Sequence, residues 1–335
     1  MIEILMRFLE NKYVSLAGII GLLLGFLSDA LDNDIAKWII FAIIVILFIF
    51  AMVNEYRLNS KFNKEVIHIP VVIKIGSKVE ASYVMNNLIE EIEKIENTSS
   101  YKRDILRFLK IDLDSFIYEF KGDIYDFDNL MDFSRYINHE IKKLQVQIGN
   151  KIEFHVAYYQ KPSIGFLLGT IFKTENISVY QNNDYKNTFF KVFDINSRKY
   201  KENKLNNEFY TIDRSYMTDE SDEILVVLNS SSHNVNVNSD KLKKYSNYVK
   251  LTLNSNGTIP YGIDWIEHSQ EIYTLLNELQ IKYKHIVLAH AMPESLSLVL
   301  GMAIENYWNL TITQYNPKTS DYDEMYTMNQ IKYFS

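Results

Sequence analysis

The sequence predicts a transmembrane α-helical hairpin at the N-terminus, followed by an α/β domain made of two fused Rossmann-like modules. Two long apolar runs near the start of the chain predict the hairpin. Short apolar segments rich in β-branched residues, each followed by a polar turn and a helix, predict parallel strands covered on both faces. One strand–turn–helix–strand unit occurs twice in the chain, which predicts two modules.

Two apolar runs are long enough to cross a bilayer. The first extends from Tyr13 to Ala30, and the second, from Ile39 to Val53, has no polar side chain and follows Trp38. About 20 mostly apolar residues cross the hydrocarbon core, and aromatic residues are favoured at its interfaces. We therefore predict two spans within residues 13–54, after an amphipathic segment (residues 1–12) and before a polar linker (residues 55–64). A cleaved signal peptide fits the first run poorly, because the run is long and a second span follows directly.

Small residues recur in the first run at helical spacing. Ala17, Gly21 and Gly25 lie four residues apart, which lets two helix backbones approach closely. Packing of the two spans against each other and self-association between subunits both explain this pattern.

Charges around the runs predict the orientation of the hairpin. The connecting loop is acidic, whereas both outer flanks carry Lys and Arg, and positively charged flanks stay in the cytoplasm. The soluble domain is therefore predicted to be cytoplasmic. The loop residues are Asp29, Asp32, Asp34 and Lys37, and the flanking cations are Arg7, Lys12, Arg57, Lys61 and Lys64.

The soluble part divides into a first half, residues 65–222, and a second half, residues 223–335. The repeated unit closes each half. Ser163 and Gly169 are six residues apart, as are Ser295 and Gly301, and a proline precedes each serine by one or two residues. Strands are predicted at 66–75, 151–159, 177–181, 188–195, 208–214, 223–229, 251–260, 284–292 and 310–315. Helices are predicted at 80–97, 164–172, 261–280 and 296–307, and residues 99–143 are predicted to be mainly helical.

Polar residues follow four of the predicted strands. Ligands of parallel sheets bind beyond the carboxyl ends of the strands, where helix N-termini offer free amides. We therefore predict one composite pocket built by both halves, with Tyr158, Tyr159, Tyr180 and Tyr315 stacking on bases. The predicted ligand-binding residues are Lys74, Ser77, Lys78, Tyr158, Tyr159, Lys161, Pro162, Ser163, Tyr180, Asn229, Ser230, Ser231, Ser232, Pro293, Glu294, Ser295 and Tyr315.

Each of these residue types also has a purely structural explanation. A serine or proline at a strand-to-helix turn is commonly a helix cap. Tyrosines often lie at the edge of a core, and lysines are often solvated. Recurrence of the same polar turn in both halves favours the binding interpretation.

Signals for catalysis or metal binding are poor. The sequence has no GxGxxG, no GxxxxGK[ST] and no HExxH motif, and no cysteine. Its histidines show no metal-binding spacing, and His155 and His290, within apolar strands, are predicted to be structural. We predict that the protein is not an enzyme and binds no cofactor and no metal. Beyond residue 60 the chain carries a net charge of −5, so the soluble domain has no broad basic face for duplex DNA.

The repeated unit resembles a known family. HAMPESLSLVLGMAIENYWNLTITQYNPKTSDYDEMYTM (residues 290–328) resembles the C-terminal block of SAVED domains, and HVAYYQKPSIGFLLGTIF with VYQNNDY (within residues 155–185) resembles the corresponding N-terminal block. The resemblance covers about residues 65–335 and implies two fused CARF-like modules. The halves differ, since Glu294 separates the proline from the serine only in the second.

The resemblance also implies a function. SAVED domains sense cyclic oligonucleotides in anti-phage CBASS systems, and two N-terminal transmembrane helices are one known effector type. We expect a cyclic oligonucleotide made by a partner nucleotidyltransferase, with a cyclic trinucleotide favoured, to drive homo-oligomerisation or filament formation and disruption of the inner membrane. The alternatives are a membrane-tethered CARF-type ring nuclease and a membrane scaffold that binds only protein.

Overall fold

The structure is a computed structural model that describes Val14, Gly18, Gly21 and residues 34–332, apart from 65, 77–79, 110, 149–151, 184–187, 205–206, 219 and 256. The amphipathic segment, Ala17, Gly25 and the rest of the first predicted span lie outside the described residues. The chain divides into one unit of Met1–Ile67 with Arg103–Lys110, and a second unit of His68–Lys102 with Ile111–Ser335.

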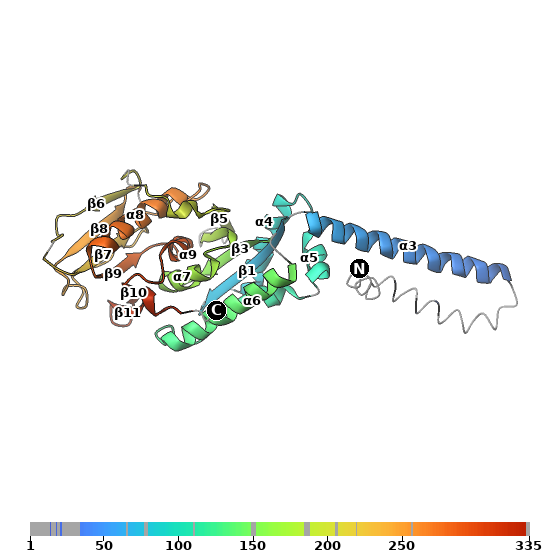
Figure 1. The fold of residues 1–335 in the computed structure, drawn as a ribbon, viewed down its shortest axis with the longest axis horizontal. Helices are drawn as coiled ribbons and strands as arrows, with labels where there is room; N and C mark the ends of the chain where they lie inside the picture. The colour runs from blue at the N-terminus through green and yellow to red at the C-terminus, as the bar shows by residue number, and fades with distance from the viewer. Residues whose placement is uncertain are drawn as a thin grey trace. The chain divides into compact units, whose positions relative to one another are not determined.

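The first unit is built around α3 (Asp34–Lys64), a helix of 31 residues that contains no glycine or proline (Figure 1). Among the described helices, α3 alone is long and apolar enough to cross a membrane, over Phe41–Phe62. These 22 residues span about 33 Å at the rise of an α-helix. The predicted linker, residues 55–64, continues this helix.

The apolar side chains of α3 are largely exposed, unlike those of a helix in a protein core. Only 17% of its most apolar stretch is buried, and Trp38, Ile46 and Phe50 are 71%, 64% and 57% exposed. Exposed apolar surface of this extent marks a contact with lipid or protein. A Cβ added to Gly21 would lie 3.8 Å from Ile44 Cδ1, an ordinary packing distance.

The first sheet of the second unit has the strand order β2-β1-β3-β4-β5. β1 runs parallel to β2, β3 parallel to β4, and β4 antiparallel to β5. Its strands are β1 (Ile67–Ile75), β2 (Ile117–Phe120), β3 (Ile152–Tyr159), β4 (Asn176–Asn183) and β5 (Thr188–Ile195). The helical elements along residues 81–201 are α4 (Ala81–Ile95), α5 (Tyr101–Leu109), η1 (Leu113–Phe116), α6 (Phe127–Ile148), α7 (Pro162–Gly169), η2 (Thr170–Phe172) and η3 (Arg198–Lys201). From Arg103 on, α5 belongs to the first unit.

The second sheet has the strand order β11-β10-β9-β7-β8-β6. Its four central strands are parallel, and both edge strands are antiparallel. The strands are β6 (Tyr210–Asp213), β7 (Glu223–Asn229), β8 (Tyr248–Leu253), β9 (His285–Ala291), β10 (Leu310–Asn316) and β11 (Asp321–Thr327). The helical elements are α8 (Ile266–Lys282), α9 (Glu294–Ala303) and η4 (Met328–Gln330).

The two-sheet α/β fold agrees with the predicted class, with four differences in detail. Both sheets are mixed, because the first has one antiparallel edge strand, β5, and the second has two, β6 and β11. β2 and β11 were not predicted, and β8 ends at Leu253 rather than at residue 260. β6 lies within the predicted first half but pairs with β8 of the second sheet.

Candidate functional site

Helices α7 and α9 join the two halves of the second unit. They lie side by side between the two sheets (Figure 1), and their backbones touch at glycines. A Cβ on Gly169 would lie 2.1 Å from the Leu298 carbonyl oxygen, and one on Gly301 would lie 2.3 Å from that of Phe166. Real Cβ atoms essentially never come this close. The glycines that recur in the sequence therefore mark the crossing of the two repeats.

The recurring serines tie each helix to the opposite half. Ser163, at the start of α7, donates its hydroxyl to Gln314 Oε1 of β10 over 2.7 Å. Ser295, at the start of α9, donates its hydroxyl to the Tyr180 carbonyl of β4 over 3.1 Å, and its backbone N–H to Gln181 Oε1 over 3.1 Å. Both serines are fully buried. Their hydroxyls thus hold the two repeats together.

The turn after β3 has an unusual backbone. Gln160 and Lys161 both have left-handed conformations, with φ of 71° and 67°, which side chains other than Gly rarely adopt. The Tyr158 hydroxyl donates to the Lys161 carbonyl, and Pro162 begins α7. Because such strain concentrates at ligand sites, the backbone of this turn is the clearest structural indication of a binding site.

The turn after β9 differs from the turn after β3 because it contains a carboxylate. Gln181 Nε2 donates to Glu294 Oε2 over 2.8 Å, while Gln181 Oε1 accepts from Ser295. The additional residue in the second half thus places a carboxylate against the end of β4. The corresponding Gln314 accepts a hydroxyl from Ser163 instead. The pseudo-symmetry of the two repeats is broken at this point.

The turn after β7 lies beside the end of β9. Ser230 donates its backbone N–H to the Ala291 carbonyl over 2.7 Å, and its hydroxyl to Tyr210 over 3.1 Å. Asn229 Oδ1 accepts the Val235 N–H over 2.8 Å. Asn229 and Ser230 are buried, whereas Ser231 is partly exposed and Ser232 exposed.

Several predicted contacts need correction. Tyr158 and Tyr180 are each 1% exposed, so neither ring offers a face to a base. Burial raises the pKa of both hydroxyls, and Tyr180 bonds to His155 Nδ1 over 2.8 Å. Lys74 is paired with Glu119 over 3.0 Å and holds no free charge for a phosphate. Ser77 and Lys78 lie outside the described residues.

The predicted residues that remain accessible form a shorter set. Each is at least partly exposed and follows a strand end or borders one. Tyr315 is 42% exposed and packs against Tyr322, with ring centroids 5.4 Å apart. Amides, hydroxyls and one ammonium group suit a polar, anionic ligand. The set is Tyr159, Lys161, Pro162, Ser231, Ser232, Pro293, Glu294 and Tyr315.

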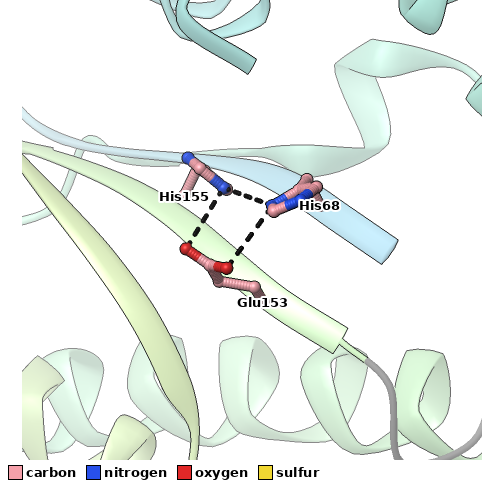
Figure 2. A group of neighbouring side chains, drawn as sticks. All are labelled: His68, Glu153 and His155. Atoms are coloured by element: carbon pink, nitrogen blue, oxygen red, sulfur yellow. Dashed lines mark hydrogen bonds and ion pairs between the residues drawn. The ribbon is translucent and has the colours of Figure 1, made fainter. Parts of the chain in front are cut away.

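A second polar cluster was missed by sequence analysis. His68 of β1 and Glu153 and His155 of β3 point toward one another (Figure 2). Burial lowers the pKa of His155 to about 3, so this ring is uncharged at neutral pH. The alternation Glu-x-His on one strand face, with a histidine near the start of another buried strand, is the signal that could have found it.

A pocket of about 440 Å³ lies away from these residues, near the amino end of β9. Its lining includes Asp222, Lys282, Lys284, Tyr307 and Trp308. None of the predicted ligand-binding residues lines it.

The fold and the joined repeats define the class of this protein as a two-module α/β domain with polar loops at its strand ends. The family model for the SAVED domain, the "SMODS-associated and fused to various effectors sensor domain", matches residues 137–328. Since this is more than half of the chain, the protein belongs to the SAVED family. No curated protein matches the chain in sequence.

Solved structures share the fold. The Acinetobacter baumannii Cap4 SAVED/CARF-domain containing receptor with the cyclic trinucleotide 2'3'3'-cAAA aligns with a TM-score of 0.50 at 12% identity, covering 97% of this chain and 77% of the receptor chain. The same receptor with 3'3'3'-cAAA gives a TM-score of 0.50 at 12% identity, covering 95% and 78%. At this identity the likeness establishes the fold alone.

Proposed function

We propose that this protein is a membrane-anchored sensor that binds a cyclic oligonucleotide, of the cyclic trinucleotide class, at the strand ends around α7 and α9. The observation that carries the proposal is the crossing of these helices, which joins the turn of each repeat to a strand end of the other and supports one composite site. The Cap4 receptors of the same fold are solved with cyclic trinucleotides, and membership of the SAVED family supports the same ligand class.

The broken pseudo-symmetry supports a ring with an odd number of nucleotides. A two-fold symmetric ligand matches two identical turns, but here only one turn carries a carboxylate, from Glu294. Carboxylates accept hydrogen bonds from base amino groups or ribose hydroxyls and repel phosphates. The Lys161 turn is the complementary place for a phosphate, because it combines an ammonium group with the start of α7.

The first unit anchors this sensor in the inner membrane. α3 supplies one span, and the apolar run before it supplies the second, with the SAVED domain in the cytoplasm. Ligand, supplied by a partner nucleotidyltransferase in an anti-phage response, promotes association of the unlike halves of neighbouring chains and disrupts the membrane. It does so only if it binds the assembled state more tightly than the single chain. The domain acts as a receptor, so the ligand leaves chemically unchanged.

Calorimetric titration of the full-length protein in detergent tests the ligand class. The ligands are 2'3'3'-cAAA, 3'3'3'-cAAA, cyclic di- and tetranucleotides, and linear triadenylate. Lys161→Ala is expected to weaken binding about tenfold, the loss of one charge-assisted contact. Lys284→Ala is the matched control, since this exposed lysine pairs with Asp222 at the opposite end of the strands. No binding by any ring, or equal affinities for the two variants, would contradict the proposed site.

Two further readouts separate the alternatives. Chromatography of the ligand after incubation should recover the intact ring, whereas cleavage would favour a ring nuclease. Dye-loaded liposomes carrying the protein should leak only after ligand is added, with growth in particle size by light scattering. Intact liposomes with bound ligand would refute membrane disruption and leave the sensor assignment standing.

A further inference from the structure

We infer that His68, Glu153 and His155 form a binding site for a divalent transition metal ion, of which Zn²⁺ is the best match. The three side chains converge near the amino ends of β1 and β3 (Figure 2). The candidate ligand loops follow the carboxyl ends of these strands, so the two sites are separate. This inference does not depend on the proposed function.

The distances fit a common ion. His68 Nδ1 lies 2.8 Å from His155 Nε2. Glu153 places Oε2 3.5 Å from His68 Nδ1 and Oε1 3.5 Å from His155 Nε2. Atoms separated in this way can all lie about 2.0–2.2 Å from one ion, which matches zinc bound by imidazole nitrogen and carboxylate oxygen.

Hydrogen bonds to surrounding residues orient the metal ligands. His68 Nε2 lies 2.9 Å from Glu96 Oε1. A carboxylate accepts only, so Nε2 carries the hydrogen and the lone pair of Nδ1 faces the cluster. Carboxylate–histidine pairs of this kind are the usual outer support of metal ligands. The Tyr180 hydroxyl lies 2.8 Å from His155 Nδ1 and holds the second ring in place, since it can either donate to this nitrogen or accept from it.

The backbone and the carboxylate are held in the same manner. The Tyr101 hydroxyl accepts the His68 N–H over 2.8 Å and donates to the His68 carbonyl over 2.7 Å. Ser178 donates its hydroxyl to Glu153 Oε1 over 2.7 Å. The ligands are therefore fixed before an ion arrives, which lowers the cost of binding.

The donor set selects the class of metal. Two imidazoles and one carboxylate suit zinc and its neighbours, whereas Mg²⁺ and Ca²⁺ prefer oxygen ligands throughout. His155 is fully buried, but the Glu153 side chain is 23% exposed, which gives an ion a path from solvent. A bound ion would connect the start of β1, which follows α3 closely in the chain, to β3.

Metal binding is tested on the full-length protein in detergent after removal of metals with a chelator. Zn²⁺ is then titrated in competition with a chromophoric zinc chelator, and melting temperature is recorded with and without Zn²⁺. We expect one Zn²⁺ per chain and a higher melting temperature. His155→Ala should weaken binding at least 100-fold, whereas His139→Ala, at an exposed position of α6, should bind as the wild type does.

A variant of nearly unchanged shape separates loss of zinc binding from misfolding. Glu153→Gln keeps the size of the side chain and an acceptor for Ser178, so its melting temperature without metal should match the wild type. Its zinc affinity should still fall at least tenfold, because an amide is a weak ligand. Wild-type protein that takes up no Zn²⁺, or zinc affinity unchanged in Glu153→Gln, would overturn the inference and show that the two imidazoles share a proton instead.

Discussion

Replacement of Gly169 by alanine tests whether the helix crossing holds the two repeats together. The added methyl group would lie 2.1 Å from the Leu298 carbonyl oxygen and 2.7 Å from the Met302 nitrogen. Both obstacles are backbone atoms, so no side-chain rotation relieves the contact. Ordinary contacts begin at 3.4 Å, and α7 and α9 must therefore move apart by about 1 Å, a gap that forfeits a quarter to a half of each contact's attraction.

The change in the free energy of unfolding follows from two opposing effects. Overpacking of a well-packed core typically costs about 1–3 kcal/mol, occasionally more, and this backbone clash belongs at the upper end. Alanine recovers up to about 1 kcal/mol relative to glycine within a helix. We expect a net loss of about 2–3 kcal/mol in the free energy of unfolding, which lowers the melting temperature by about 4–12 °C in a domain of this size.

Differential scanning fluorimetry of full-length protein in detergent measures the shift. Gly122→Ala is the control, because the atoms nearest to its Cβ belong to the Phe120 side chain rather than to a neighbouring backbone. Gly301→Ala should resemble Gly169→Ala. The double variant should lose less than the sum of both, since a single opening of the crossing accommodates two methyl groups. A Gly169→Ala melting temperature equal to that of Gly122→Ala would refute the reasoning.

Three further predictions concern other parts of the chain. Ser163→Ala leaves the buried Gln314 Oε1 without its donor and should lower the free energy of unfolding by about 1–3 kcal/mol in urea denaturation. Burial lowers the pKa of His290 to about 4, whereas an unfolded histidine titrates near 6.5. The unfolded state therefore gains a proton first as the pH falls, so stability should drop between pH 6.5 and 4, and His290 contributes up to about 1.4 kcal/mol per pH unit to that drop, measured by melting temperature. Ile46→Lys places a charge within α3 and should cost membrane insertion about 3 kcal/mol, which reduces the membrane-bound fraction in flotation.

Each of these three predictions has a matched control. Ser232→Ala, at an exposed position, should leave urea denaturation unchanged, and equal losses in both serine variants would contradict the structural role of Ser163. His290→Leu should flatten the decline in stability with acid, so an unchanged slope would show that other groups cause it. Tyr56→Lys, at an exposed position toward the polar end of α3, should float as the wild type does. Flotation of Ile46→Lys at the wild-type level would argue against a membrane span.

The buried parallel strands were the most predictable part of the fold. β7 has the predicted bounds, 223–229, because it is an apolar run that ends at a polar residue. The repeated serine and glycine positions predicted two related units. The structure adds the reason for the glycines, which is contact between helix backbones more than a hundred residues apart in the chain.

Features that depend on distant partners were not predictable from local patterns. β11 carries charged side chains along its length and is a strand only because it pairs with β10. The sequence around Tyr180 does not distinguish it from a ligand-binding tyrosine. Only the packed sheet shows that its ring is buried. His68 and His155 are 87 residues apart, so no motif spacing connects them.

The joining of both repeats in one chain has a consequence for the free energy of recognition. Two separate chains carrying these units would first have to meet and lose translational freedom, and any ligand between them would have to offset that loss. Here the connecting chain keeps the second repeat at a high effective concentration near the first, and the glycine crossing forms during folding. Formation of the joined repeats within one chain therefore does not depend on protein concentration, which affects only the later association of neighbouring chains.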